Sequence, residues 1–409
     1  MKEKKIDNRI ARSGGSRFWK AALLTVAAGS FIFVVMSRFI VVVGEKNGKL
    51  LGSMYKIEEE DFDNPRLQLL RKRERLDDVV ASGRTQFEKF VLLRQWTRKL
   101  WKGEKGGQFY YPPWDAVEII DLARKIDNEG FCAQFAIVFL QACQSLGLHA
   151  RYVDLPDHFV VAVWSDEFND WVIMDPTADI HYEKNGFPLG GHDLLEAYWN
   201  NKVRGIFKVG SDGSRKHIKK EDIAQYRIFS IMLSANQIRE PVQIIQNGVK
   251  KILVLDKNYK NYPVIGKDTL SFCGMFLAWK EDGRPELSNK IMSGEAADFE
   301  YPENQSIIEH SVLDPKRGIV RLRLFADNSP TFKTFMLKGD REGWSEVPNK
   351  VEVTLHPGVN KISAKIITQY GWEGPTSYIK LYYKPRWFPK TADETKKHYT
   401  LSQSEEVAE

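Results

Sequence analysis

The sequence predicts an α+β protein with an N-terminal membrane-spanning helix, a mixed domain of helices and strands, and a C-terminal β-sandwich of immunoglobulin type. Three observations lead to this fold class. A long apolar run follows a basic N-terminus, an apolar helical segment in the middle of the chain precedes strand-like segments, and short strand-like runs separated by turns fill the C-terminal part. The chain has 409 residues, enough for two or three domains.

The N-terminus has the pattern of a signal anchor. Residues 1–17 form a basic tail, and residues 1–20 contain seven basic and two acidic side chains. The apolar segment 18–43, uncharged over 21–36, approaches the length of about 20 residues that spans a bilayer. Because basic flanks stay in the cytoplasm, we expect a single-pass cell-membrane protein with its bulk exported, periplasmic or extracellular. Signal-peptide cleavage near 27–30 and a soluble core helix are the alternatives.

The positive charge is concentrated in this N-terminal segment. The net charge of the chain is +6, residues 1–20 and Arg38 together supply all of it, and the remainder is formally neutral. A nucleic-acid-binding protein would carry basic patches on its folded domains, so we expect no nucleic-acid partner. The three cysteines lack the spacing of a zinc site, and we expect no metal or cofactor. An odd number of cysteines in an exported chain favours a free thiol.

A helical region is expected to precede the central strands. Residues 44–85, rich in both charges, are expected to form a juxtamembrane linker with some helix. The next domain, 86–235, opens with one apolar helical face and a second helix over 114–126. Residues 131–146 are apolar nearly all round and predict a buried helix that Gly147 ends. Cys132 then lies in the first turn, where the helix dipole favours a thiolate.

Three strand-like runs follow this helix, over 150–155, 158–164 and 171–174. The turn-rich segment 165–170 makes the last two a β-hairpin. His158 begins its first strand and Asp175 ends its second, so direct pairing would bring their Cβ atoms to about 5 Å. A register shift of a residue or two still places His158 beside Asp175. Asp157 should point to the opposite strand face, which makes Asp175 the better partner for His158.

A thiol, an imidazole and a carboxylate in this order are the components of a thiol-based acyl-transfer enzyme. The imidazole takes the thiol proton and later protonates the leaving amine. The carboxylate orients the ring and stabilises the imidazolium. Cys132, His158 and Asp175 are therefore the predicted catalytic residues.

The segment 130–182 resembles the transglutaminase-like superfamily, which also contains peptide N-glycanases and bacterial cysteine peptidases. The resemblance rests on a Gly-x-Cys helix, a Leu-Gly-x-x-Ala-Arg-Tyr-Val strand, an Asp-His strand and a Trp-x-x-x-Asp-Pro strand, and extends back to about Phe87. It implies a papain-like cysteine-peptidase core with Cys132 as nucleophile, His158 as base and Asp175 as third member. Ala162 stands where members often carry glutamate, which weakens the transfer of any substrate contact made there.

Other candidate residues have simpler interpretations. Cys143 lies three helical turns from Cys132, about 16 Å away, which excludes a disulfide and favours core packing. Cys273 is expected in a buried strand. The resemblance implies that an upstream Trp can stabilise the oxyanion, which makes Trp114 a candidate donor. Packing is favoured for Trp96, Trp101 and Trp114, and the Cys132 backbone N–H suffices as a donor. His181 and Tyr182 are assigned either to the cleft or to an ordinary loop.

The C-terminal part predicts β-structure. Residues 236–315 are expected to form a β-rich connecting region, 316–386 the β-sandwich, and 387–409 a disordered tail. Exposed aromatic residues such as Trp344 and Trp372 leave a carbohydrate-binding role open, although a structural spacer is the favoured interpretation.

The sequence therefore predicts a membrane-anchored thiol enzyme, a cysteine hydrolase or acyltransferase that forms a thioester on a protein, peptide or glycopeptide substrate. Water would release the acyl group in a peptidase or amidase, and an amine would release it in a transglutaminase. The resemblance favours hydrolysis for a bacterial-looking chain of this architecture. An exported anchor fits the cytosolic role of peptide N-glycanases poorly. The alternative is a catalytically inactive transglutaminase-like fold that acts as a surface binding or structural protein.

Overall fold

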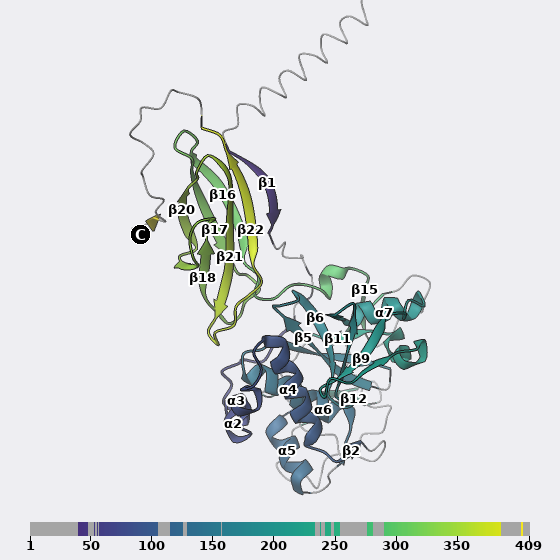
Figure 1. Ribbon diagram of the computed structural model, residues 1–409. Coiled ribbons are helices and arrows are strands. Elements are labelled where there is room, and N and C mark those ends of the chain that lie inside the picture. The colour runs from purple at the N-terminus through teal and green to yellow at the C-terminus, as the bar shows by residue number, and fades with distance from the viewer. Residues whose placement is uncertain are drawn as a thin grey trace, which may run out of the picture.

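The structure is a computed structural model that describes residues 40–47, 53, 55, 57–104, 115–125, 129–156, 158–233, 238, 242–246, 249–253, 276–280, 290–385 and 402–403. Most of the predicted membrane span, together with Trp114, Asp157 and Cys273, lies outside these residues, as does nearly all of the predicted tail. The described residues form a domain of helices and strands and a β-sandwich (Figure 1).

A ten-stranded sheet organises the first domain, with the strand order β10-β9-β7-β6-β5-β4-β11-β14-β15 and β8 paired with β7. The strands that carry its centre are β4 (Ala150–Leu155), β5 (His158–Ser165), β6 (Asp170–Asp175) and β7 (Ile180–Lys184). The others are β8 (Phe187–Pro188), β9 (Ile206–Gly210), β10 (Arg215–His217), β11 (Ser230–Met232), β14 (Phe276–Trp279) and β15 (Ile291–Ser293). The three strands predicted at 150–174 are thus confirmed, as is the hairpin of the last two, and all three are neighbours in one sheet.

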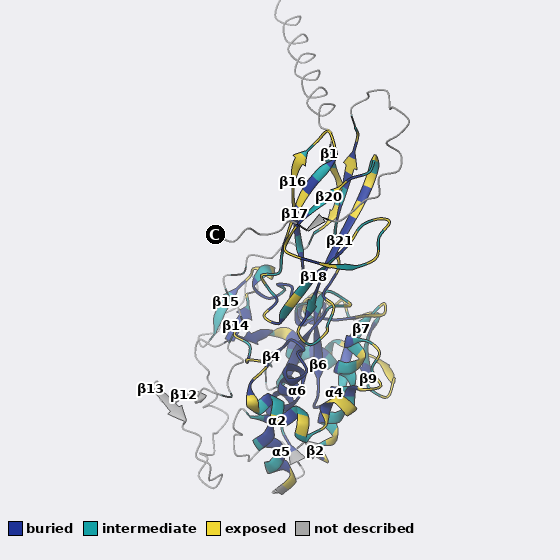
Figure 2. Cartoon of the chain, turned by 90° about the vertical axis from the view of Figure 1, so that its left-hand side faces the viewer, coloured by how far each residue is buried: buried dark blue, intermediate teal, exposed yellow. Residues whose placement is uncertain are grey.

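Helices cover both faces of this sheet. One face packs against α2 (Pro65–Arg73), α3 (Leu76–Val80), α4 (Gln86–Lys99), α5 (Ala116–Lys125) and α6 (Cys132–Ser145). The other packs against α7 (Gly191–Trp199), the 3₁₀ helix η1 (Lys220–Arg227) and the segment after η4 (Ala296–Asp298). Alternate side chains of each strand point into different cores. In β5, Val161 and Val163 face the α6 side, whereas Val160 and Ala162 face the other side. Helix α6 is buried along most of its length (Figure 2).

Two further pairs of strands lie outside the large sheet. Strand β2 (Gly103–Glu104) pairs in parallel with β3 (Glu129–Gly130), just before α6. Strands β12 (Val242–Gln246) and β13 (Val249–Leu253) form an antiparallel hairpin.

The second domain consists of two sheets packed face to face. One has the order β1-β22-β21-β18-β19 and the other β16-β17-β20-β23. Side chains from both, including Leu322 and Leu381, share one apolar core. The strands are β1 (Ile40–Lys46), β16 (Ile307–Asp314), β17 (Ile319–Phe325), β18 (Phe332–Lys338), β19 (Ser345–Val347), β20 (Lys350–Thr354), β21 (Gly358–Thr368), β22 (Ser377–Tyr383) and β23 (Ser402–Gln403). The two-sheet sandwich agrees with the prediction, while its immunoglobulin type stays a prediction.

The boundaries predicted for the span and the linker need correction. Residues 40–43 lie in β1, which pairs antiparallel with β22, so a spanning helix cannot extend to residue 43. The run Ile40–Val43 is β-branched, and a short apolar run of this kind suits a strand as well as a helix. No helix within the described residues is both long and apolar enough to cross a membrane. The expected linker 44–85 in fact holds the end of β1 and helices α2 and α3.

The predicted connecting region is also divided differently. Strands β14 and β15 extend the large sheet of the first domain, whereas β16 belongs to the sandwich. The Asn47 side chain joins β1 to β16 by donating to the Ile308 carbonyl and accepting from its N–H, at 2.6 and 2.7 Å. The sandwich therefore begins at residue 307 rather than 316, and it incorporates a strand from the N-terminal part of the chain.

A loop of the sandwich closes the C-terminal end of α6. Trp372 Nε1 donates to the Leu146 carbonyl at 3.0 Å, and the Lys89 ammonium lies 4.6 Å from the Trp372 ring centroid. Tyr370 covers Gly147, where an added Cβ would lie 2.1 Å from the ring. The Trp372 indole therefore contacts the other domain at the junction between them. This contact argues against the carbohydrate-binding role considered for this residue.

Candidate active site

Cys132 is the first residue of α6, as predicted, and its side chain is partly exposed. The Gln134 side chain accepts from the Phe131 N–H at 3.1 Å and so stabilises the start of the helix. The Trp101 ring lies against Gly130, where an added Cβ would be 2.9 Å from the ring. These contacts, with the β2–β3 pairing, hold the chain that leads into the Cys132 position.

His158 and Asp175 meet at the open end of the β5–β6 hairpin. His158 Nε2 lies 2.9 Å from Asp175 Oδ2. In the β5–β6 register Val161 pairs with Met174, and extension of this register places Asp175 opposite Val160, two residues from His158 on the same face. The contact is therefore diagonal rather than directly cross-strand, within the reach expected for long side chains.

The turn after β6 holds the Asp175 carboxylate. Asp175 Oδ1 accepts from the backbone N–H groups of Thr177 and Ala178, at 2.9 and 3.1 Å. The residue is only 4% exposed. One carboxylate oxygen is thus fixed by the backbone while the other faces the imidazole, which sets the orientation of the His158 ring.

The Cys132 thiol and the His158 ring are within hydrogen-bonding reach of each other. Burial opposes the imidazolium charge, but hydrogen bonds from the ring to Asp175 and Cys132 outweigh this effect and raise the pKa of His158 to about 10. Because Nε2 faces Asp175, Nδ1 is the ring nitrogen left for the sulfur. The structure thus brings all three predicted residues together, with a ring that keeps its proton at neutral pH.

A buried arginine binds the turn that holds Asp175, and the sequence reasoning missed this residue. Arg94 on α4 is fully buried, and its Nε donates to Asp179 Oδ1 at 2.9 Å. Its Nη1 lies 2.9 Å from His181 Nδ1. Asp179 ends the turn whose N–H groups hold Asp175, so the ion pair fixes that turn. The available signal was a charged residue on the apolar face of α4, beside Phe90 and Leu93.

His181 has a structural place in this network. Arginine can only donate, so His181 Nδ1 must accept from Arg94, and Nε2 then carries the proton that it donates to Glu183 Oε1 at 2.9 Å. Burial and the charge of Arg94 lower the pKa of His181 to about 4, so the ring is neutral at physiological pH. Its position is on strand β7, not in a loop.

The remaining candidates pack in the core. Cys143 is fully buried, and burial raises the pKa of its thiol well above the usual range. Trp101 is 3% exposed and packs against Phe135, and Trp96 packs against the same core. Ala162 is buried on the sheet face opposite α6. Within the described residues, no group of three or more His, Cys, Asp or Glu side chains is placed to hold a metal ion.

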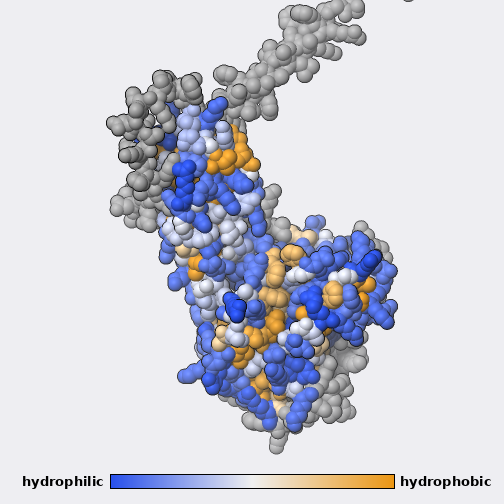
Figure 3. Space-filling view, in the orientation of Figure 1, coloured by the Kyte–Doolittle hydropathy of each residue, from blue (hydrophilic) through white to orange (hydrophobic). Residues whose placement is uncertain are grey.

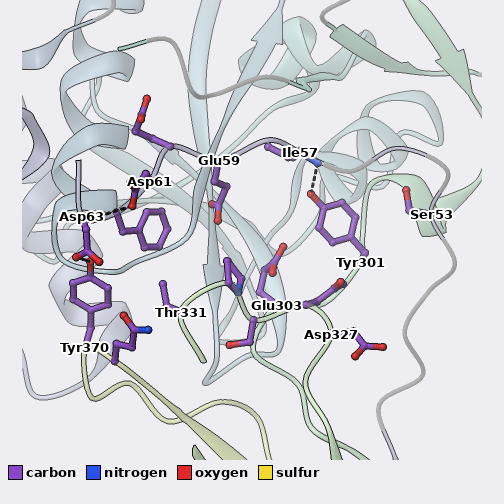
Figure 4. Close-up of a pocket in the computed structure, with 16 residues that line it drawn as sticks. Ser53, Ile57, Glu59, Asp61, Asp63, Tyr301, Glu303, Asp327, Thr331 and Tyr370 are labelled. Carbon is purple, nitrogen blue, oxygen red and sulfur yellow. Dashed lines mark hydrogen bonds between the residues drawn. The ribbon is translucent and has the colours of Figure 1, made fainter. Parts of the chain in front are cut away.

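A separate acidic cavity lies between the two domains, with a volume of about 720 Å³ (Figure 4). Tyr370, which covers Gly147 just beyond α6, is one of its walls, so it lies at the opposite end of that helix from Cys132. Burial raises the pKa of Glu303 in its wall to about 8. Cys132, His158 and Asp175, called the triad from here on, do not line it. The carboxylates that line it are Glu59, Glu60, Asp61, Asp63, Glu303 and Asp327.

Comparison with known proteins assigns the domain that holds the triad. The model of the transglutaminase-like superfamily matches residues 73–176, a segment that contains Cys132, His158 and Asp175. Residues 73–176 therefore form a transglutaminase-like superfamily domain, which confirms the resemblance. The match begins at Arg73, the last residue of α2, and so extends further back than Phe87.

The matches to whole proteins are remote. A solved structure of red sea bream transglutaminase matches with 11% sequence identity and a TM-score of 0.22, covering 79% of this chain and 72% of that chain. A TM-score this low does not establish a shared overall architecture. No curated protein matches the chain.

Proposed function

We propose that the transglutaminase-like domain is a thiol enzyme that opens an amide bond through a Cys132 thioester. The observation that carries this proposal is the chain of contacts from Cys132 to His158 to Asp175. The family assignment supports it, because the transglutaminase-like superfamily includes cysteine enzymes that use these residue types. Cys132 is the nucleophile, His158 the proton carrier and Asp175 the group that orients the ring.

The first half of the reaction uses the protonated ring that the geometry favours. The Cys132 thiolate attacks the carbonyl carbon and forms the carbon–sulfur bond, while the Cys132 backbone N–H, which has no partner within the helix, is placed to stabilise the oxyanion. His158 gives its proton to the leaving nitrogen as the carbon–nitrogen bond breaks. The product is a thioester and a free amine, and His158 is left neutral.

The second half returns the enzyme to its starting state. Neutral His158 takes a proton from water, or from an acceptor amine, as that group attacks the thioester carbonyl. The carbon–sulfur bond breaks and restores the thiolate beside a protonated ring. Water gives a carboxylic acid, as in a peptidase or amidase, and an amine gives a new amide, as in a transglutaminase. We favour hydrolysis of a protein, peptide or glycopeptide substrate.

Trapping the acyl-enzyme would test this function. Incubation of the protein with a casein digest and hydroxylamine should produce peptide hydroxamates, because hydroxylamine captures thioesters. Cys132→Ala should abolish the product, whereas Cys143→Ala, a change in a buried core position, should retain it. Labelling by iodoacetamide gives a second readout that needs no substrate. An unlabelled Cys132 at neutral pH, together with no hydroxamate, would favour a non-catalytic binding role for the same fold.

We further propose that the protein is held at the cell membrane by residues 18–39, with the described domains exported. The support is the basic N-terminus followed by an apolar segment. Protease added to intact cells, or after permeabilisation of an outer membrane, should digest the sandwich. Protection of the sandwich under both conditions would contradict export.

A further inference from the structure

Exposed hydrophobic side chains gather at one end of the sandwich. Nine large hydrophobic residues are exposed among the described residues, and six of them belong to the sandwich. Val43 is 53% exposed, Val359 50% and Tyr382 40%. Hydrophobic residues are visible at the β1 end of the sandwich in Figure 3. The six are Val42, Val43, Val312, Leu313, Val359 and Tyr382, and together they are called the apolar tip.

Strand pairing brings these residues from four distant segments to the same end. Tyr382 pairs with Val41 on one side and with Val359 on the other. The neighbouring residue Tyr383 donates its hydroxyl to the Lys316 carbonyl at 2.7 Å, which brings the end of β16 and its turn to the same place. The apolar tip is therefore a product of the fold, since no local segment of the sequence contains it.

The chain enters the sandwich at the apolar tip. Strand β1 begins at Ile40, which pairs with Tyr383. The residues immediately before it, 18–39, form the apolar segment that we propose to be the membrane anchor. Because consecutive residues lie within 3.8 Å of one another, the membrane boundary of such an anchor must be close to the tip.

The charges around the tip suit a bilayer with anionic headgroups. Lys316, Arg317 and Lys384 are exposed beside it. Asp314 is the carboxylate in the same turn, and it lies 3.7 Å from the Arg317 guanidinium. Apolar side chains bordered by basic ones are the composition by which protein surfaces bind anionic membranes.

We propose that the apolar tip rests in the headgroup region of the membrane, so that the sandwich stands between the bilayer and the transglutaminase-like domain. This proposal rests on the membrane anchor proposed above. Strand β21, with eleven residues at about 3.3 Å each, gives the sandwich a length of roughly 35 Å. Cys132 is therefore held away from the lipid surface, where it meets substrates that stand above the membrane rather than lipid-embedded ones.

Spin labelling of the full chain in liposomes would test this placement. The variant Val359→Cys, in a Cys132→Ser background, carries a nitroxide at the tip. Phe187→Cys, which is 65% exposed on the other domain, is the matched control. The background without an added cysteine measures labelling elsewhere. In liposomes of phosphatidylcholine and phosphatidylglycerol, we expect the accessibility of the Val359→Cys label to aqueous nickel chelate to be about tenfold lower than that of the Phe187→Cys label. The accessibility of the Val359→Cys label to oxygen should be retained.

The possible results distinguish the placement of the apolar tip from the membrane anchor and the catalytic function proposed above. Flotation of the protein with liposomes tests the anchor, and a chain that stays at the bottom of the gradient overturns both anchor and tip. Flotation with equal nickel accessibility at Val359→Cys and Phe187→Cys overturns the tip alone. A third result concerns detergent micelles. If the Val359→Cys label is protected from nickel chelate there at high protein concentration, and this protection is lost on dilution, the tip contacts a second copy of the chain. That result would overturn the lipid contact. The hydroxamate assay reports on catalysis independently.

Discussion

His158 Nε2 lies 2.9 Å from Asp175 Oδ2, although these residues are offset by two positions in the β5–β6 hairpin. The N–H groups of the turn after β6 bind the other Asp175 oxygen. A carboxylate held on one side by the backbone and on the other by the ring fixes the tautomer of His158 and aims Nδ1 at the Cys132 sulfur.

The first prediction concerns this carboxylate. Asp175→Asn should slow iodoacetamide alkylation of Cys132 at pH 7 by at least about 10²-fold, because the ring loses its orientation and the imidazolium its counter-charge. The rate is measured by mass spectrometry of the Cys132 peptide. Cys143, fully buried, should stay unlabelled in both proteins and so serves as an internal control for intact folding. Equal alkylation rates in the two proteins would remove Asp175 from the site.

The second prediction concerns Arg94. Arg94→Met should lower the free energy of unfolding by about 3–5 kcal/mol, because Asp179 and His181 are left without their buried partner. Urea titration measures the change. The matched control is Arg75→Ala, which removes an ion pair of a guanidinium with an 80% exposed side chain and should cost less than about 1 kcal/mol.

A second readout separates positioning from general stability. If Arg94 fixes the turn that holds Asp175, Arg94→Met should also slow Cys132 alkylation under conditions where the variant is still folded, as judged by near-UV circular dichroism. Loss of stability with an unchanged alkylation rate would make Arg94 a core ion pair without influence on the triad.

The third prediction is a pH dependence of stability. His149 is buried beside Glu59, at 2.6 Å, and faces Glu303 and Asp166. Burial lowers the pKa of His149, but these carboxylates outweigh it and raise the pKa to about 10, above the ordinary value of 6.5. A group whose pKa is higher in the folded state stabilises fully below its unfolded pKa and loses that contribution as the pH rises. The free energy of unfolding should therefore fall between pH 6.5 and 10.

The contribution of His149 can be isolated by substitution. Glu303 and His158 also have raised pKa values, about 8 and about 10, and add to the same slope. His149→Gln should flatten the slope between pH 6.5 and 10 more than His217→Gln, at an exposed position on β10. The measurement is urea unfolding at several pH values. An unchanged slope in His149→Gln would show that the ring is uncharged in the folded protein.

The fourth prediction concerns the junction between the domains. Trp372→Phe keeps an aromatic ring beside Lys89 but removes the donor to the Leu146 carbonyl, at a cost of about 1 kcal/mol. Trp372→Ala removes both contacts and should separate the calorimetric unfolding transitions of the two domains. Trp344→Ala, within the sandwich and beside Lys365, should leave the transitions merged as in the parent. A single unchanged transition in Trp372→Ala would mean that other contacts couple the domains.

Several features of this molecule could be predicted because they depend on neighbours in the sequence. The helix that begins at Cys132 follows from its apolar composition and glycine ends, and the strand alternation around His158 follows from the two-residue repeat. The predicted hairpin limits the distance between His158 and Asp175, since a short connection leaves few registers. The three candidate catalytic residues could therefore be predicted from 44 consecutive residues.

Tertiary structure decided the features that join distant segments. Ile40 pairs with Tyr383 across more than 300 residues, and an apolar run of this length has no local signal that separates a strand from the end of a spanning helix. Arg94 and His181 meet because α4 covers one face of the sheet to which β7 belongs, and a buried charge finds its partner only through such packing. Local patterns thus specify which residues can act and in which elements they lie. The free energy of burying shared surfaces decides which elements meet. It thereby decides which residues support the triad and which residues form the apolar tip.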